Sequence, residues 1–421
     1  MTKKPDAPAI RFKGFSDAWE QRKLTEFVEF FSGLTYTPND VQENGTLVLR
    51  SSNVSNGEVV DADNIYVNPQ VVNSENVKVG DIVVVVRNGS RSLIGKHAQI
   101  KAFMPNTVIG AFMTGIRSEC PEFTNALLNT SRFEEEIAMN MGATINQITG
   151  YMFSKMEFKV PCLDEQKKIG EYFEKLDNLI TLHQRKFEKL TNVKKSMLEK
   201  MFPQNGSSYP EIRFKGFTDP WEQRKFGEVF MSLQNNTLSR AELNDEFGAA
   251  QNIHYGDVLI KYDEILDVSK EPLSYIEKQS IADKFKTSYL QNGDVIIADT
   301  AEDETVGKCT EIEGLTDQKV ISGLHTMPVR PNRKFASGFL GFYLNSAAYH
   351  DQLKPLMQGI KVTSISKGAM QDTVVKFPLD LKEQEQIGIY FGGLDHLITL
   401  HQRELEKLQN IKKSLLEKMF V

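Results

Sequence analysis

Two long internal repeats constrain the fold of this chain more than any other feature. The segment IRFKGFSDAWEQRK at residues 10–23 returns as IRFKGFTDPWEQRK at residues 212–225, with 12 of 14 positions identical. A second segment, residues 165–202, returns at residues 383–420 with 27 of 38 positions identical. Long repeats within one chain indicate duplicated structural units. The 421 residues therefore form two units, each with a similar head and a similar tail.

Between head and tail, the two units share an order of motifs but little identity. VGDIVVVV (79–86) corresponds to NGDVIIAD (292–299), and IGKHAQI (94–100) corresponds to VGKCTEI (306–312). The apolar, β-branched runs DIVVVV, DVIIA and GDVLI are predicted to be strands. Helices are expected around residues 123–138 and 335–353. Each middle is therefore a mixed α and β domain, and the two domains have the same fold but different content.

The repeated tails are predicted to be long helices. Their apolar residues recur at steps of three or four, which indicates a coiled-coil seam. Because the chain holds two such helices, each is the economical partner of the other, and we expect an antiparallel pair with pseudo-twofold symmetry. The alternative is that each helix packs on its own domain. The predicted seam consists of Ile180, Phe187, Leu190, Val193 and Met197 in the first helix and Ile398, Leu405, Leu408, Ile411 and Leu415 in the second.

The predicted fold class is therefore α+β, with two α/β domains and two long helices. Residues 1–160 form the first domain and residues 161–202 the first helix. Residues 203–211 (PQNGSSYPE) form a polar linker, residues 212–377 the second domain and residues 378–421 the second helix.

Composition limits the function classes. The net charge of −6 argues against a uniformly basic nucleic-acid-binding protein but leaves room for a local basic groove. The 3 cysteines form no CxxC pair, so we expect no structural metal and a reducing, cytoplasmic setting. No apolar run is long enough for a transmembrane helix, and the start resembles no signal peptide.

Catalytic signatures are absent from the sequence. It contains no phosphate-binding loop, HExxH, GxSxG or GxGxxG. It also lacks the (N/D)PP(Y/F) segment with which an adenine methyltransferase holds its target amine. We therefore expect a non-catalytic protein with no cofactor and no metal of its own; a self-sufficient nuclease or methyltransferase would need motifs that this chain lacks.

Polar segments after the predicted strands are candidate DNA contacts. Arginine and asparagine suit bidentate readout of guanine and adenine, lysine suits phosphates, and small polar side chains suit either. The alternative for each segment is a solvated loop. The candidates are Arg50, Asn53, Arg87, Asn88, Ser90, Arg91, Lys96, Asn146 and Gln147 in the first unit and Thr300, Lys361, Thr363, Ser364 and Lys367 in the second.

The repeated head allows two interpretations. Its basic residues alternate with Phe12, Phe15 and Trp19, which is typical of a nucleic-acid patch. Its near-verbatim return favours a structural role, because residues that read two different sequences should differ. We expect the aromatic residues to anchor each unit and the basic residues to face solvent, a partner or phosphate.

The head PEIRFKGFTDPWEQRK, the Gly-Asp strands and the two EQ..IG.YF..LD.LITLHQR helices together resemble the specificity subunit of type I restriction-modification systems. The resemblance covers the whole chain. It implies that each α/β domain is a target recognition domain for one half of a bipartite DNA sequence. It also implies that the helices form an antiparallel coiled coil that sets the spacer between the half-sites.

The same resemblance implies the partners. Two modification methyltransferase subunits would bind this bacterial, cytoplasmic protein and use S-adenosylmethionine. Two restriction subunits, which use ATP and Mg²⁺, would join through them. The alternative function is a non-DNA scaffold that presents two binding domains on a coiled coil.

Overall fold

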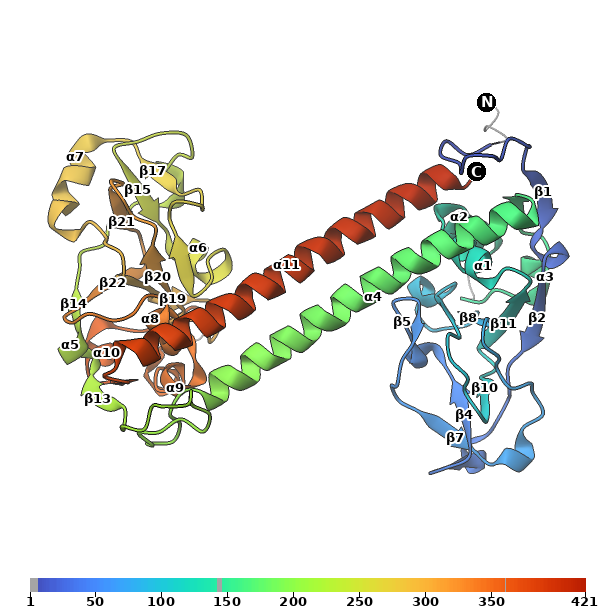
Figure 1. The fold of residues 1–421 in the computed structure, drawn as a ribbon, viewed down its shortest axis with the longest axis horizontal. Helices are drawn as coiled ribbons and strands as arrows, with labels where there is room; N and C mark the ends of the chain where they lie inside the picture. The colour runs from blue at the N-terminus through green and yellow to red at the C-terminus, as the bar shows by residue number, and fades with distance from the viewer. Residues whose placement is uncertain (1–6, 142–145, 360) are drawn as a thin grey trace. The chain divides into compact units, whose positions relative to one another are not determined.

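The computed structural model describes residues 7–141, 146–359 and 361–421. The chain divides into two compact units. Unit 1 comprises residues 1–184 and 402–421, and unit 2 comprises residues 185–401. Each unit thus contains part of both long helices, α4 (Leu163–Lys200) and α11 (Leu381–Met419), which Figure 1 labels. None of the helices in these described ranges is long and apolar enough to cross a bilayer.

Each unit is built on a central sheet in which the predicted buried strand lies in the interior. The strand order is β2-β11-β8-β9 in unit 1 and β14-β22-β18-β20-β16 in unit 2. Strands β8 (Ile82–Val85) and β18 (Val295–Ala298) confirm the predictions from DIVVVV and DVIIA, and every residue in both is buried. The other strands are β2 (Val28–Ser32), β11 (Met113–Ser118), β9 (His97–Gln99), β14 (Phe230–Ser232), β22 (Thr326–Pro331), β20 (Cys309–Glu313) and β16 (Ile265–Asp267).

A second sheet in each unit has a parallel pair and an antiparallel neighbour. Its order is β10-β4-β7-β3 in unit 1 and β17-β15-β21 in unit 2. The equivalent positions of β4 and β15 show that the two middles share one framework despite their low identity. The strands are β10 (Thr107–Ile109), β4 (Thr46–Leu49), β7 (Ile65–Val67), β3 (Val41–Gln42), β17 (Ser274–Ile276), β15 (Ala250–Ile253) and β21 (Val320–Ser322), with a further pair, β5 (Val54–Ser55) and β6 (Glu58–Val59), in unit 1.

The predicted short helices are present but interrupted. Helices α1 (Pro121–Leu128) and α2 (Ser131–Asn140) are separated at Thr130, whose side chain caps α2 by accepting from the Phe133 amide. Unit 2 has α8 (Phe339–Asn345) and α9 (Ala347–His350), which meet at Ser346. The remaining helices are α3 (Gly150–Phe153), α5 (Phe226–Val229), α6 (Tyr255–Ile260), α7 (Gln279–Ala282) and α10 (Lys367–Gln371), and the 3-10 helices are η1 (Leu24–Glu26), η2 (Pro38–Asp40), η3 (Ser51–Asn53), η4 (Pro69–Val71), η5 (Arg91–Leu93), η6 (Arg240–Glu242), η7 (Asp283–Ser288) and η8 (Lys354–Leu356).

One predicted strand is wrong. The segment GDVLI forms helix α6 instead of a strand. Nδ1 of His254 accepts from the Gly256 amide at 3.1 Å and so caps the first turn. Val258 is buried, whereas Ile260 is 88% exposed. A run of three apolar residues does not distinguish a buried strand from a short helix, and here the cap decides.

The repeated head is a structural frame in both units. Its EQRK residues form β1 (Glu20–Lys23), which pairs antiparallel with β12 (Glu157–Val160) directly before α4. In unit 2, β13 (Glu222–Lys225) pairs in the same way with β24 (Val374–Phe377) directly before α11. The variable middle of each unit is therefore closed by a repeated strand pair at its base.

Arginine from each head makes a bidentate ion pair with the adjoining tail. Arg11 donates from Nε and Nη2 to Glu165 at 2.7 Å each, and Glu165 is fully buried. Arg213 donates to Glu383 at 2.7 and 2.8 Å. Breaking such a buried pair leaves an unpaired charge, at a cost of roughly 3–5 kcal/mol. These two head arginines are thus committed to the frame, contrary to the expectation that the basic residues face solvent or a partner.

An aromatic residue just past the end of each long helix completes the core of one unit. In unit 1, Phe420 stacks on Phe123 at 5.6 Å and meets the edge of the buried Trp19 at 6.0 Å. In unit 2, Phe202 occupies the equivalent position, 6.1 Å from Trp221 and stacked on Phe391 at 5.7 Å. The last turn of α11 therefore belongs to the core of unit 1, and the end of α4 belongs to the core of unit 2.

A repeated glycine lets each long helix approach its own domain closely. A Cβ at Gly170 of α4 would lie 2.7 Å from the Phe123 amide nitrogen of α1. A Cβ at the equivalent Gly388 of α11 would lie 2.5 Å from the Ser337 carbonyl oxygen. Only glycine fits both contacts, which explains why the residue recurs in an otherwise polar helix start.

Candidate nucleic-acid interface

In unit 1, two predicted loops that lie far apart in the sequence meet at the end of β8. Arg87 forms an antiparallel bridge with Gln147. The Asn146 side-chain amide donates to the Gly89 carbonyl at 3.0 Å. Residues 142–145 of this second loop lie outside the described residues. The structure thus joins the candidates Arg87, Asn146 and Gln147 into one surface, which we call the unit 1 strand-end surface.

The segment after β4 joins the same surface. Nδ2 of Asn88 donates to the Ser51 hydroxyl at 3.1 Å. Arg50, one residue earlier, donates from Nη2 to the Asp63 carbonyl at 2.6 Å. Arg50 therefore lies at this end of the unit with its guanidinium directed by a backbone contact.

Asn53 does not belong to the interface. It is fully buried, and its amide donates to the Ala62 carbonyl at 2.6 Å and to Asn64 Oδ1 at 2.9 Å. Its own Oδ1 accepts from the Arg50 backbone amide at 3.0 Å. Because both ends of the amide are used inside the domain, the prediction that Asn53 contacts DNA is wrong for this conformation.

The remaining unit 1 candidates surround Arg87. Arg87, Ser90 and Arg91 are exposed, and Lys96 immediately precedes β9 in the same hairpin. The Arg87 guanidinium carbon lies 5.0 Å from the ring centre of Phe112, which is 57% exposed. Stacking on an aromatic face limits the rotamers of the arginine and leaves its donors directed outward. These residues give unit 1 an exposed, basic strand end.

Unit 2 has the same backbone arrangement with different side chains. Strand β19 (Thr300–Ala301) follows β18 and pairs antiparallel with β23 (Thr363–Ser364), opposing Thr300 to Ser364. This pair corresponds to the Arg87–Gln147 bridge of unit 1. Lys361 is exposed in the turn before β23, beside residue 360, which is not described; Lys367 is exposed at the start of α10. The structure therefore brings Thr300, Thr363 and Ser364 together, with lysines nearby; we call these the unit 2 strand-end surface.

One residue of this surface, His325, was missed by the sequence analysis. The Asp299 amide donates to the His325 carbonyl at 3.1 Å, as the Val86 amide donates to the Phe112 carbonyl at 3.0 Å in unit 1. His325 therefore occupies the position of Phe112. The offset of 213 residues that aligns β8 with β18 also aligns Phe112 with His325, so a signal was present in the sequence.

The two long helices contact each other within each unit. In unit 1, Ile180 of α4 and Leu408 and Leu415 of α11 pack on one apolar core. In unit 2, Leu190, Val193 and Met197 of α4 pack on the core that contains Leu394 of α11. Phe187, Ile398 and Leu405 are half-buried. Ile411 is 38% exposed and lines a surface groove; its repeat equivalent Val193 lines the equivalent groove and also packs on the unit 2 core.

An identical ion pair links the helices in each unit. Asp177 of α4 contacts Lys412 of α11 at 2.6 Å in unit 1. In unit 2, Asp395 of α11 contacts Lys194 of α4 at 2.7 Å. Burial raises the pKa of Asp395 to about 6, against the opposing effect of Lys194. The two ion pairs are equivalent in the repeat. Asp177 and Asp395 occupy the same position in their tails, and so do Lys194 and Lys412.

A shallow groove is also duplicated on the helices. In unit 1 it is lined by Arg403, Glu406, Lys407, Asn410, Ile411, Ser414 and Leu415, together with Ile10, Tyr172 and Lys418. In unit 2 it is lined by the repeat equivalents Arg185, Glu188, Lys189, Asn192, Val193, Ser196 and Met197. The two grooves thus share equivalent positions, with valine and methionine in unit 2 where unit 1 has isoleucine and leucine. Within the described ranges, no three His, Cys, Asp or Glu side chains are grouped so as to hold a metal.

The chain thus contains two similar frames that carry different strand-end surfaces. The family described as the type I restriction modification DNA specificity domain matches residues 16–192 and 218–410, once in each repeat. The chain therefore belongs to the type I restriction-modification DNA specificity subunits.

Curated relatives match over nearly the whole chain. The specificity subunit of the type I restriction enzyme StySPI from Salmonella potsdam is 23% identical over 441 residues, covering 96% of this chain and 89% of that protein. The EcoKI specificity subunit from Escherichia coli is 23% identical over 427 residues, with the same coverage. The crystal structure of a type I restriction-modification S subunit from M. genitalium superposes with a TM-score of 0.57 at 14% identity, covering 99% of both chains, and shows the same fold.

Proposed function

We propose that this specificity subunit reads a bipartite DNA sequence, with the strand-end surface of each unit contacting one half-site. The observation that carries this proposal is the contrast between duplicated frames and divergent surfaces. Arg87 and Phe112 in unit 1 are replaced by Thr300 and His325 on the same backbone positions in unit 2. Different side chains on one framework suit two half-sites of different sequence, because base edges are read by side-chain chemistry.

The division of roles within each surface follows from chemistry. An outward-facing arginine such as Arg87 can donate two hydrogen bonds to guanine O6 and N7. Lysines such as Lys96, Lys361 and Lys367 suit phosphates, which supply affinity but no sequence information. A local basic surface of this kind is compatible with the net charge of −6 because only the contact surface meets the DNA.

We further propose that α4 and α11 form an antiparallel coiled coil that sets the spacer. The duplicated Asp177–Lys412 and Lys194–Asp395 pairs support this assignment, because one antiparallel register satisfies both. Ile180 and Leu408 both pack on the core of unit 1, and Leu190 packs on the core of unit 2, so both helices contribute to each end of the pair. Helix length is a suitable ruler because half-site separation is a geometric quantity. In this proposal the target recognition domains are residues 1–160 and 212–377.

The duplicated groove is the proposed docking site for a modification methyltransferase. It is formed almost wholly by residues of the repeated tails, and it occurs once in each unit. Two equivalent grooves suit two copies of one partner. In this scheme the chain has no catalysis of its own: the methyltransferase subunits supply S-adenosylmethionine chemistry in the bacterial cytoplasm. Two restriction subunits that use ATP and Mg²⁺ would join through them.

The proposal is tested by co-expressing this chain with the candidate methyltransferase of the adjacent reading frame and mapping methylated adenines. The expected result is methylation at one asymmetric, bipartite sequence. Arg87→Ala should lower methylation at that sequence and relax one position of one half-site by roughly 5- to 150-fold, the range of a lost bidentate base contact. The other half-site should remain unchanged.

Lys334→Ala is the matched control, because Lys334 is an exposed cation past the far end of β22. It should leave both half-sites as in the wild type. Equal relaxation of both half-sites by Arg87→Ala would contradict the assignment of one half-site to each unit. DNA binding by the complex that does not weaken between low and moderate salt would favour the scaffold alternative instead.

A further inference from the structure

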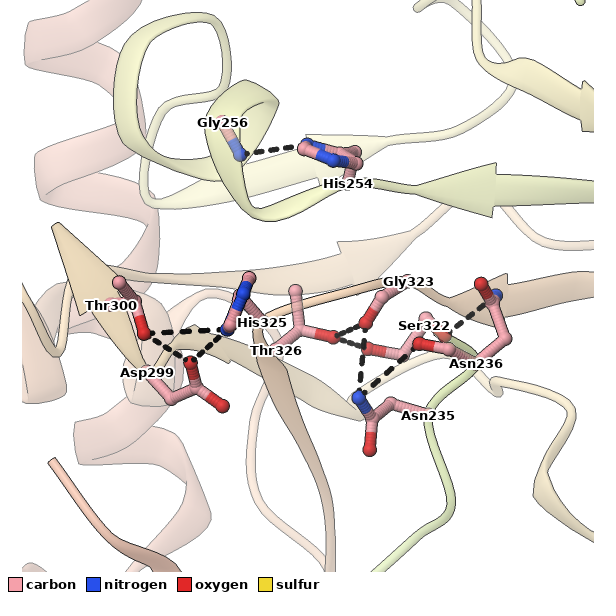
Figure 2. Close-up of polar contacts among 10 residues, drawn as sticks. All are labelled: Asn235, Asn236, His254, Gly256, Asp299, Thr300, Ser322, Gly323, His325 and Thr326. Carbon is pink, nitrogen blue, oxygen red and sulfur yellow. Dashed lines mark hydrogen bonds and ion pairs between the residues drawn. The ribbon is translucent and has the colours of Figure 1, made fainter. Parts of the chain in front are cut away.

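A polar cluster at the end of β18 in unit 2 centres on His325. Figure 2 shows its imidazole beside Asp299 and Thr300. Nδ1 of His325 lies 3.4 Å from Asp299 Oδ1 and 3.4 Å from Thr300 Oγ1, and Thr300 Oγ1 donates to Asp299 Oδ1 at 2.8 Å. The side chain of His325 is 48% exposed. One ring nitrogen is thus held by the protein, while much of the ring faces outward.

The backbone of His325 is held in a conformation that a non-glycine residue rarely adopts. Its φ is 54°, in the left-handed region. The turn before it is fixed at the Gly323 carbonyl, which accepts from Asn235 Nδ2 at 3.2 Å and from Thr326 Oγ1 at 2.6 Å (Figure 2). Such strain persists where the surrounding contacts hold it in place, and it is concentrated at binding and catalytic sites.

The imidazole is also packed from the side. The Tyr255 ring meets His325 edge-on, with ring centres 5.3 Å apart. Tyr255 is the first residue of α6, whose start is fixed by the His254 cap on the Gly256 amide. Burial and the nearby Arg240 lower the pKa of His254, which keeps its Nδ1 available as an acceptor. Two neighbouring elements therefore set the position of the His325 ring.

We propose that His325 is a specificity-determining residue of unit 2 that accepts a hydrogen bond from an exocyclic amino group, adenine N6 or cytosine N4, in the major groove. This inference rests on the proposed function of the strand-end surfaces. The Asp299 carboxylate favours the proton on Nδ1, so Nε2 of the neutral imidazole is an acceptor. Among the residues that the structure describes, Nε2 has no hydrogen-bond partner. The base amino groups are the hydrogen-bond donors of the major groove.

The equivalent place in unit 1 supports a role in specificity. Phe112 occupies the position of His325, and the adjacent Arg87 guanidinium lies over its ring. Unit 1 thus presents donors where unit 2 presents an acceptor. Two half-sites of different sequence require such a difference, and the backbone around it is otherwise matched.

The test compares His325→Ala and Asp299→Asn with the wild type in the complete methyltransferase complex. A DNA library randomised at both half-sites is methylated at pH 8 and sequenced. We expect His325→Ala to lower discrimination at a single position of one half-site by roughly 5- to 30-fold, the value of one lost base contact. The preferred base there in the wild type should be adenine or cytosine, and the library distinguishes the two. Asp299→Asn should weaken the preference at the same position, because Asp299 orients the ring.

His325→Gln provides a second variant that keeps a polar side chain, in case the alanine variant does not assemble. It should change the strength of the base preference at that position, because its amide reaches the base differently from the imidazole, without lowering the melting temperature. The inference is overturned if the folded variants keep the wild-type preference at every position, or if every position of both half-sites weakens equally. Absence of methylation at any bipartite site by the wild-type complex would instead contradict the proposed function.

Discussion

At the scale of single residues, matched positions in the two units separate structural roles from the recognition roles proposed above. Arg11 and Arg213 make the same bidentate pair with Glu165 and Glu383, so their identity follows from the frame. By contrast, Phe112 and His325 share a backbone position but not a chemistry. A residue that recurs at the repeat offset is therefore assigned to the frame, and a residue that changes on a conserved backbone is assigned to recognition.

Glu311 of β20 is a buried carboxylate of unit 2 that has no ionisable counterpart in unit 1. Its carboxylate accepts from the Gly338 and Gly341 amides at 2.9 Å each. Burial nevertheless raises its pKa to about 7. The residue at the same place in unit 1 is Gln99, which cannot ionise.

We predict that the stability of unit 2 falls as the pH rises from about 4.5 to about 7. In this window the folded state binds more protons than the unfolded state, so the stabilisation present at low pH is lost as the pH passes the folded value of about 7. The full effect is at most roughly 3 kcal/mol, from a shift of about 2.5 pKa units. Glu311→Gln should reduce this slope and leave the smaller part that comes from Asp395, whose pKa is also raised by burial. Thermal unfolding at pH 5.5 and pH 8 measures it, with the exposed Glu304→Gln as the control. An unchanged slope in Glu311→Gln would contradict the prediction.

At the scale of elements, the sequence predicted what is encoded locally. Strands β8 and β18 followed from uninterrupted β-branched runs, and α4 and α11 followed from long apolar periodicity without glycine or proline in the second half. Helix α6 was predicted as a strand because its short apolar run is ambiguous, and the His254 cap lies outside the run. The exposure of Ile411 was missed because heptad spacing does not state which face a neighbouring domain covers.

The site was predictable only in part, for a physical reason. The sequence analysis identified Arg87 from a strand end and Gln147 from a polar loop. Their bridge joins residues that are 60 positions apart in the sequence. The buried position of Asn53 depends on Ala62 and Asn64, which accept hydrogen bonds from its side-chain amide. Tertiary contacts of this kind cannot be predicted from a local sequence pattern.

Lengthening both long helices tests the proposed ruler. We predict that one heptad inserted after Arg185 and another after Arg403 will lengthen the spacer by about three base pairs. Seven residues add about 10 Å of helix, at ~1.5 Å per residue, and a base pair spans about 3.4 Å. A whole heptad keeps the apolar seam in register. Methylated-adenine mapping reads the spacer and both half-sites at once.

A seven-residue insertion in the polar linker, after Asn205, is the control for the added length. Asn205 is exposed between α4 and β13, so this insertion should leave the spacer unchanged. If the heptad variant folds and methylates sites with the original spacer, the helices do not set the separation of the half-sites.

At the scale of the whole molecule, the account rests on duplication with divergence. Each unit has the same strand pair at its base, the same buried tryptophan, the same arginine–glutamate pair and the same helix groove. The variable parts, residues 24–156 and 226–373, lie between the paired strands of these bases. The frame therefore offers two matched places where one variable part can replace the other.

The most direct test of the central claim replaces residues 226–373 with a second copy of residues 24–156. The chimeric chain is co-expressed with the methyltransferase, and methylated adenines are mapped. If each unit reads one half-site, the target becomes a palindrome in which both halves are the unit 1 half-site, with the spacer near its original length. A folded chimera that still methylates the original asymmetric sequence would contradict the account.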